Sequence, residues 1–190
     1  MKKVTIVGVG AIGSHVALLL RNEATLRIVD MDRVESKNVM SQFHGRPGVG
    51  KGKVQSLQQS MQLMFGLRIE GIPHRLTEDN QDQLLSGSDL IVDCLDNAKS
   101  RIIVQSYARR TGTPCLHGAL APGGQFGQAI WDPAFRIDDE SGMGGATCEN
   151  GEHLPFIAMV SALVAQSAKL FLREGRTVGF QAYPGGFNKV

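Results

Sequence analysis

Cysteine is scarce in this sequence, and aromatic residues make up only 6% of it. The three cysteines are Cys94, Cys115 and Cys148, an odd number at wide spacing. This pattern excludes a disulfide framework and a Cys-x-x-Cys zinc motif, and it fits a reducing compartment. We therefore expect a cytoplasmic protein.

An excess of charge of one sign is also lacking. The formal net charge is +2, and Lys and Arg are scattered along the chain. A surface that binds nucleic acid needs clustered cations, so we expect no nucleic-acid partner. The apolar runs fall short of the ~20 residues of a membrane span, and the N-terminus has no signal-peptide pattern. We expect no membrane association.

The composition is otherwise that of an ordinary globular protein. The apolar share is 42% over 190 residues, which is long enough for one hydrophobic core without a metal or a disulfide to support it. We find no internal repeat and no linker. The sequence therefore predicts a single domain over residues 1–190.

A glycine motif lies between the first strand pattern and the first helix pattern. Gly8, Gly10 and Gly13 have the spacing Gly-x-Gly-x-x-Gly, directly after the apolar run 4–7. Gly8 permits a tight turn, Gly10 lets the backbone approach a phosphate, and Gly13 allows the helix and the strand to pack closely. A phosphate would then be held by amides at the helix N-terminus. The motif predicts a nucleotide site.

Asp30 closes the second apolar strand pattern, 17 positions after Gly13. A carboxylate at this place can accept hydrogen bonds from ribose hydroxyls. The first strand–helix–strand unit, residues 2–30, fits either a dinucleotide or ATP, and by itself it leaves both interpretations open.

Alternation of strand and helix patterns predicts an α/β fold. Parallel strands joined by helices give a Rossmann-like, doubly wound, mostly parallel sheet with helices on both faces. The polar and apolar alternation after Gly124 predicts antiparallel strands at the C-terminal side. Residues 31–52 are expected to form an irregular loop, and 184–187 a flexible end. The expected strands are 2–8, 26–30, 67–72, 88–94, 115–119, 125–131 and 177–182, and the expected helices are 12–22, 53–65, 77–85, 98–111 and 154–172.

The segment 29–42, Val-Asp-Met-Asp-Arg-Val-Glu-Ser-Lys-Asn-Val-Met-Ser-Gln, resembles the D-x-D-x-V-E-x-S-N-x-x-R-Q stretch of the ThiF/MoeB/HesA family. These enzymes activate ubiquitin-like proteins and sulfur carriers. Three further matches follow in family order: Val49-Gly50-Lys51-Gly52-Lys53, then Asp93-Cys94-Leu95-Asp96-Asn97 with Arg101, then Thr147-Cys148-Glu149-Asn150-Gly151 before a long helix rich in small residues.

The resemblance implies an adenylyltransferase. Its reaction would be MgATP-dependent adenylation of the C-terminal glycine of a ubiquitin-like or sulfur-carrier protein, with release of pyrophosphate. ATP and Mg²⁺ would be the cofactors, and the last helix would form a homodimer. Two anions must meet in this reaction, which calls for cations and backbone amides.

The family pattern also assigns roles to individual residues. The three glycines would form the turn that faces the phosphates, and Asp30 would hold the ribose. Asp96 would act through Mg²⁺, a hard cation that favours carboxylate and phosphate oxygens. The residues expected over the phosphates are Asn38, Gln42 and Lys53, and those expected to support the Asp96 loop are Asn97 and Arg101.

Two candidate site residues carry alternatives. Asp32 either contacts the nucleotide or forms an ion pair with Arg33. Cys148 lies where many relatives hold a thiol that receives the activated acyl group, as a thioester or a persulfide. Cys94 and Cys115 lie in apolar strand patterns and are expected to be inert.

Ser41 stands where family members usually have an arginine that contacts phosphate, and Arg46 or Lys51 is the candidate to replace its charge. The paired Cys-x-x-Cys zinc motifs of many relatives have no counterpart. One alternative is therefore a non-catalytic nucleotide-binding subunit that presents a ubiquitin-like partner. A second, based on the first unit alone, is a small NAD-dependent oxidoreductase.

Overall fold

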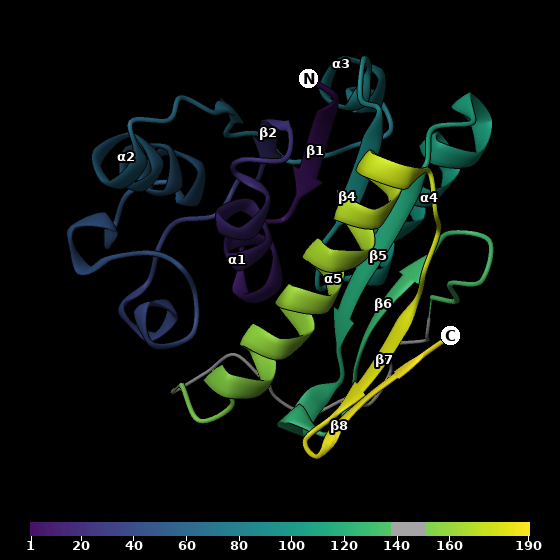
Figure 1. Ribbon diagram of the computed structural model, residues 1–190. Coiled ribbons are helices and arrows are strands. Elements are labelled where there is room, and N and C mark those ends of the chain that lie inside the picture. The colour runs from purple at the N-terminus through teal and green to yellow at the C-terminus, as the bar shows by residue number, and fades with distance from the viewer. Residues whose placement is uncertain (138–150) are drawn as a thin grey trace.

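One eight-stranded sheet organises the chain (Figure 1). The structure is a computed structural model that describes residues 1–137 and 151–190. The strands lie in the order β3-β2-β1-β4-β5-β6-β7-β8. Their bounds are β1 Lys3–Val7, β2 Thr25–Val29, β3 Glu70–Ile72, β4 Leu90–Asp93, β5 Cys115–Leu120, β6 Gly127–Trp131, β7 Phe180–Tyr183 and β8 Gly186–Lys189.

The sheet has a parallel part and an antiparallel part. Strands β3, β2, β1, β4 and β5 run parallel, whereas β6, β7 and β8 are added antiparallel to their neighbours. Strand order reverses between β1 and β4, because β2 and β3 lie on one side of β1 and the later strands on the other. Ligands of open α/β sheets bind at such a reversal, beyond the carboxyl ends of the strands.

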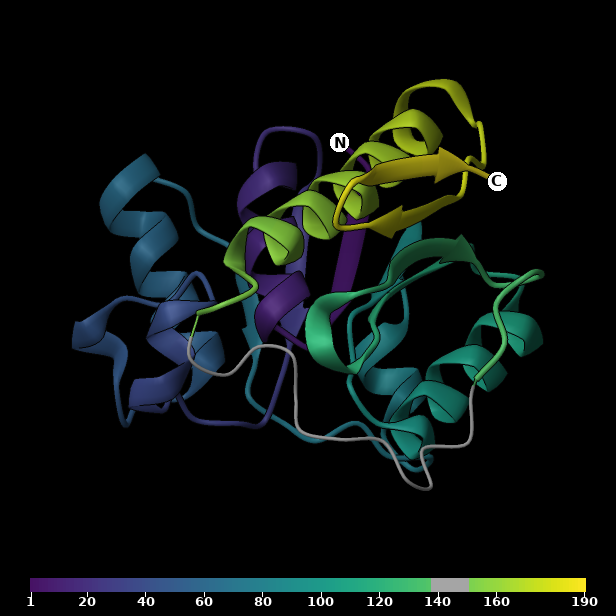
Figure 2. The same ribbon diagram turned by 90° about the horizontal axis from the view of Figure 1, so that it is seen from below.

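Helices cover both faces of the sheet. Figure 2 shows α5 together with α1 on one side and α4 on the other. The apolar side chains of α1, α2 and α5 form one core with the sheet, and those of α3 and α4 form a second core on the opposite face. The helix bounds are α1 Ala11–Leu20, α2 Lys53–Phe65, α3 Gln81–Leu85, α4 Ala98–Thr111 and α5 Leu154–Glu174.

Local sequence explains where these helices begin and end. The side chain of Asn97 accepts a hydrogen bond from the Ser100 amide and caps the start of α4. Gly66, Gly112 and Gly175 follow α2, α4 and α5 in the left-handed conformation, which glycine adopts at low cost.

The predicted fold class is confirmed, and the bounds of α4 agree at both ends. The predicted loop 31–52 contains two short 3₁₀ turns, Ser36–Met40 and Arg46–Gly48. Strand β3 is shorter than predicted, because only Glu70–Ile72 finds a partner on β2.

Two predictions were wrong. The end of the chain is a β-hairpin and not a flexible tail, because Gly186–Lys189 pairs with Phe180–Tyr183. The prediction that every apolar run is too short to span a membrane was also wrong, because α5 is long and apolar enough to do so. Half of its most apolar window is buried inside the fold, against α1, β5 and β6, as is typical of a core helix.

Candidate nucleotide-binding site

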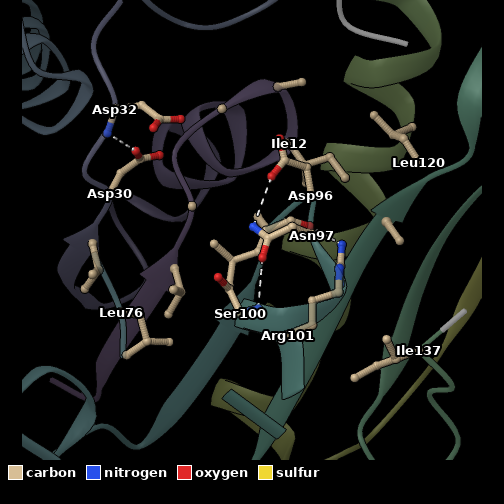
Figure 3. Close-up of a pocket in the computed structure, with 18 of the residues that line it drawn as sticks. Ile12, Asp30, Asp32, Leu76, Asp96, Asn97, Ser100, Arg101, Leu120 and Ile137 are labelled. Atoms are coloured by element: carbon tan, nitrogen blue, oxygen red, sulfur yellow. Dashed lines mark hydrogen bonds between the residues drawn. The ribbon is translucent and has the colours of Figure 1, made fainter. Parts of the chain in front are cut away.

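A cavity of about 650 Å³ lies beyond the ends of β1, β2 and β4. In Figure 3, Asp30 and Asp32 lie on one wall, and Asp96, Asn97 and Arg101 lie across from them. The volume is within the range of small-molecule sites. The structure therefore brings together, at the reversal of strand order, residues that the sequence places far apart.

The glycine loop forms the floor of this cavity, and its glycines have different surroundings. Gly8 has φ +84°, and a Cβ there would lie 2.9 Å from the carbonyl oxygen of Cys94. A Cβ on Gly13 would lie 1.8 Å from the carbonyl oxygen of Gly8. A Cβ on Gly10 would approach only Gln42, at 3.9 Å. Gly8 and Gly13 therefore permit tight packing, and Gly10 leaves open space beside the start of α1, where an anion fits.

Asp30 lies at the end of β2 with both carboxylate oxygens bonded. Oδ2 accepts from the Val9 amide at 2.8 Å, and Oδ1 accepts from the Asp32 amide at 2.8 Å. Burial raises the pKa of Asp30, although Lys53 and these amides act in the opposite direction. These bonds fix the carboxylate at the cavity wall, and each oxygen keeps capacity to accept from a ribose hydroxyl.

Lys53 lines the cavity at the start of α2, and its side chain is 11% exposed. Its Nζ lies 3.0 Å from Asp32 Oδ2. Burial lowers the pKa of Lys53, but Asp30 and Asp32 outweigh it and raise the value above the usual range. The ammonium is therefore charged at neutral pH. The alternative pairing of Asp32 with Arg33 was wrong, since Arg33 donates to the carbonyl oxygen of Gly50.

Asp96 is an exposed carboxylate on the opposite wall, in the loop between β4 and α4. Asn97 donates to Asp96 at 3.4 Å while it caps α4. Arg101 donates to the carbonyl oxygen of Leu95 and so holds the loop that presents Asp96. The expected supporting positions of Asn97 and Arg101 agree with this arrangement.

Mg²⁺ fits this carboxylate only together with a ligand. Among residues 1–137 and 151–190, no three His, Cys, Asp or Glu side chains gather closely enough to hold a metal ion. Mg²⁺ commonly binds through one or two carboxylates together with substrate phosphates. Asp96 beside an open phosphate position matches that donor set.

Gln42 and Asn38 differ in their relation to the cavity. Gln42 lines it, and its buried Oε1 has no hydrogen-bond partner among the described residues, so this oxygen is available to a ligand donor. Asn38 does not line it. Its Oδ1 accepts from the Glu35 amide in a reciprocal capping box that fixes the 3₁₀ turn Ser36–Met40. Contact of Asn38 with a nucleotide stays a prediction.

The cysteines divide into two groups. Cys94 lines the cavity and Cys115 is buried in β5; burial raises the pKa of both thiols, which fits the expected inert role. Cys148 lies outside the described residues, as do Asp138 to Asn150, and its assigned role stays a prediction.

Several cavity residues were missed by sequence reasoning. Arg75 follows the end of β3, and Phe135 and Arg136 follow the end of β6. Their position after a strand end was the available signal. Ser41 stands in place of the family arginine, and neither candidate to replace that arginine's charge lines the cavity. Arg46 lies away from the cavity, and Lys51 donates to Gln59.

With this geometry in place, comparison with known proteins identifies the family. The sequence pattern of the ThiF family matches residues 1–177. The chain belongs to the ThiF family.

Curated relatives within the ThiF family include adenylyltransferases. The sulfur carrier protein adenylyltransferase of Thermus thermophilus is 35% identical over 121 residues, which cover 62% of this chain and 45% of that protein. The molybdopterin-synthase adenylyltransferase of Salmonella typhimurium is 28% identical over 185 residues, covering 92% of this chain and 74% of that protein. The chain thus spans less than half the length of the Thermus relative.

Solved structures share the fold over the whole chain. Escherichia coli MccB, crystallised with AMPCPP and MccA, has a TM-score of 0.80 with 15% sequence identity and covers 100% of this chain and 63% of its own. At this identity the likeness establishes the fold. The ThiF fold and the predicted family resemblance are therefore confirmed.

Proposed function

We propose that this chain is a ThiF-type adenylyltransferase that uses MgATP to activate the C-terminal carboxylate of a small carrier protein. The carrier would be a ubiquitin-like or sulfur-carrier protein. The observation that carries the proposal is the convergence of Lys53, Asp96 and the open face of Gly10 on one cavity. Relatives named as adenylyltransferases support it.

The reaction requires an anionic nucleophile to reach a phosphorus atom. A carrier carboxylate oxygen forms a bond to the α-phosphorus, the bond from that phosphorus to the bridging oxygen breaks, and pyrophosphate leaves with the electron pair. Positioning and charge stabilisation carry such a transfer, more than acid-base chemistry does. Lys53 would neutralise phosphate charge, and amides near Gly10 would donate to phosphate oxygens.

Asp96 would hold Mg²⁺, which neutralises phosphate charge when bound. Asp30 would accept from the ribose hydroxyls. Arg101, whose guanidinium is bonded to Asp93 and two carbonyl oxygens, keeps the Asp96 loop in place and has little freedom to contact the ligand.

We further propose a homodimeric, cytoplasmic enzyme. Outward-facing Ala158 and Ala162, one turn apart on α5, would let a second helix approach closely. Light scattering after size exclusion would show a mass of two chains.

Pyrophosphate exchange with ATP tests the activity, in the presence of candidate carrier proteins. Lys53→Ala and Asp96→Ala should each reduce exchange by about a hundredfold or more. The first removes the ammonium that would neutralise phosphate charge, and the second removes the carboxylate that would hold Mg²⁺. Lys51→Ala is the matched control, since its ammonium is exposed and bonded to Gln59. Full exchange by Lys53→Ala would contradict the assignment.

A second candidate is a subunit that binds ATP without turnover. It is favoured by one observation: Ser41 replaces the family arginine, and neither Arg46 nor Lys51 lines the cavity. MgATP binding by the parent chain without exchange, for every carrier tested, would support it.

A further inference from the structure

A buried histidine is hydrogen-bonded to the middle of the glycine loop. His44 follows the 3₁₀ turn Ser36–Met40, is 3% exposed, and has its Nε2 2.9 Å from the carbonyl oxygen of Val9. A carbonyl oxygen only accepts hydrogen bonds, so Nε2 carries a proton and donates it. Val9 lies between Gly8 and Gly10, and this bond therefore reaches the part of the loop that borders the open phosphate position.

Packing alone does not explain a histidine at this place. Nδ1 of the His44 ring is buried and has no hydrogen-bond partner among the described residues. Burial lowers the pKa of His44, although its bond to Val9 acts in the opposite direction, so the ring is uncharged at neutral pH and Nδ1 is an acceptor. An unpaired buried acceptor destabilises a fold, and an apolar side chain would avoid that cost.

The bond to Val9 fixes the direction in which the next peptide group faces. In a trans peptide, the carbonyl oxygen and the following amide hydrogen point to opposite sides. His44 lies outside the lining of the cavity, whereas Gly10 is part of it. Because the Val9 carbonyl is turned to His44, the Gly10 amide is turned away from His44, toward the cavity side of the loop.

Other side chains hold the peptide groups on either side. The Val9 amide donates to Asp30 Oδ2 at 2.8 Å, and the Gly10 carbonyl oxygen accepts from Ser14 Oγ at 2.6 Å. The same Ser14 oxygen accepts from the Phe43 amide at 2.9 Å, which ties the segment that contains the histidine to the start of α1. The peptide group between these two depends on the histidine for its orientation.

This central peptide group has freedom to rotate when its carbonyl is not held. Gly10 has φ −83°, and glycine also adopts positive φ at little cost, so it permits a flip of the Val9–Gly10 peptide. The flipped peptide would present a carbonyl oxygen where the amide hydrogen stands. An amide binds a phosphate, whereas a carbonyl oxygen, with its partial negative charge, repels it.

We propose that His44 is a positioning residue for the nucleotide site: by donating to the Val9 carbonyl oxygen, it holds the Gly10 amide toward the phosphate position. The consequence for binding rests on the proposed function. The role belongs to the donor at Nε2 and not to the size of the ring, because the hydrogen bond is what sets the direction of the peptide group.

Two variants of His44 separate the donor from the volume of the side chain. His44→Leu fills a similar space without a donor, whereas His44→Gln places an amide N–H donor at about the same distance from the backbone. Ser161→Ala is the matched control. Its buried Oγ donates to the carbonyl oxygen of Ile157 on α5 at 2.7 Å, and it does not line the cavity.

Isothermal titration calorimetry measures the affinity of each variant for MgATP. His44→Leu should bind about fivefold more weakly than the parent, the effect of one hydrogen bond, and His44→Gln and Ser161→Ala should stay within about twofold of it. Urea unfolding of all three shows that a general loss of stability, which Ser161→Ala shares, does not lower affinity. Parent-like affinity in His44→Leu, or an equal loss in both His44 variants, overturns the proposal.

Nuclear magnetic resonance separates this proposal from the proposed function. Labelling of valine carbonyl carbons and glycine amide nitrogens isolates four Val–Gly peptides, of which Val9–Gly10 is one. In the nucleotide-free protein, the Val9–Gly10 signal should broaden in His44→Leu through exchange between two peptide orientations, and it should stay sharp in His44→Gln.

The two results are then read together. If the Val9–Gly10 signal broadens in His44→Leu while the parent fails to bind MgATP, the function is wrong and the positioning role holds. If the parent binds MgATP and this signal is the same in His44→Leu as in the parent, the positioning role is wrong and the function stands.

Discussion

Gly10 and Gly13 belong to one motif, yet they differ at the level of single atoms. The missing side chain of Gly13 is replaced by the carbonyl oxygen of Gly8, whereas the missing side chain of Gly10 leaves space. The first is a requirement of packing between α1 and the loop, and the second would serve the proposed ligand. A mutation therefore separates the two.

We expect Gly13→Ala to lower the free energy of unfolding by about 3 kcal/mol, since a methyl group would overlap a backbone atom that has little freedom to move. Gly52→Ala is the control, because the nearest atom to its Cβ would be 3.7 Å away. Since Gly52 is the N-cap residue of α2, its effect should be about 1 kcal/mol or less. Urea unfolding of both variants measures this. Equal free energies of unfolding for the two variants would show that the glycine loop shifts to make room for the methyl group, and would contradict the prediction.

At this scale the sequence predicted the residues that carry a recognisable local pattern. Gly8, Gly10, Asp30 and Lys53 line the cavity, and Gly13 packs against the carbonyl oxygen of Gly8 behind it. Arg75 was missed, although its position after the end of a predicted strand was an available signal. The pairing of His117 with Asp93 could not be predicted, because no local spacing records which residue of a neighbouring strand a side chain meets in the folded sheet.

Helix α5 lies close to the sheet because two strands carry glycine beneath it. A Cβ on Gly127 of β6 would lie 2.5 Å from Val160 Cγ2, and one on Gly118 of β5 would lie 3.0 Å from Val164 Cγ2. Each glycine thus receives a valine of α5, one helical turn apart. These contacts set the distance between α5 and the sheet.

Gly127→Ala should destabilise the protein by about 1 to 3 kcal/mol through this overlap. Combined with Val160→Ala, it should cost about 1 kcal/mol less than the sum of the single changes, because the second change makes room for the first methyl group. Gly127→Ala with Val164→Ala is the control pair and should be additive within about 0.5 kcal/mol. Additivity in both pairs would contradict close contact at Gly127.

Helices with clear capping residues at both ends were predicted well, as α4 between Asn97 and Gly112 illustrates. The hairpin of β7 and β8 was missed because Pro184, Gly185 and Gly186 are typical of a flexible end. What orders it is pairing with the rest of the sheet and the edge contact of Phe180 with Phe187, at 5.9 Å between ring centres. Such contacts are not visible in local composition.

For the whole molecule, the two faces of the sheet serve different purposes. The α1 and α5 side is an apolar core, whereas the α4 side contains a buried hydrogen-bonded cluster of Asp93, Arg101 and His117 that backs the cavity. Under the proposed function, a nucleotide bound in the cavity would contact residues from several strands and helices at once. Its binding should therefore stabilise the entire fold.

MgATP at about a hundred times its Kd should stabilise the protein by ~2.7 kcal/mol, and the melting temperature should rise accordingly. NAD at the same concentration should have little effect, and Lys53→Ala should lose most of the MgATP effect while Lys51→Ala keeps it. Thermal unfolding with each nucleotide measures this. Stabilisation by NAD without a response to MgATP would favour the oxidoreductase.

The contact between Lys53 and Asp32, 3.0 Å long, means that the cation of the cavity already has a counter-charge before any ligand arrives. An entering anion must exchange partners with Asp32. A singly charged ligand gains little from that exchange, whereas a triphosphate with its several charges gains much more. Under the proposed function, the Lys53–Asp32 ion pair would therefore favour ligands that carry several negative charges over ligands that carry one.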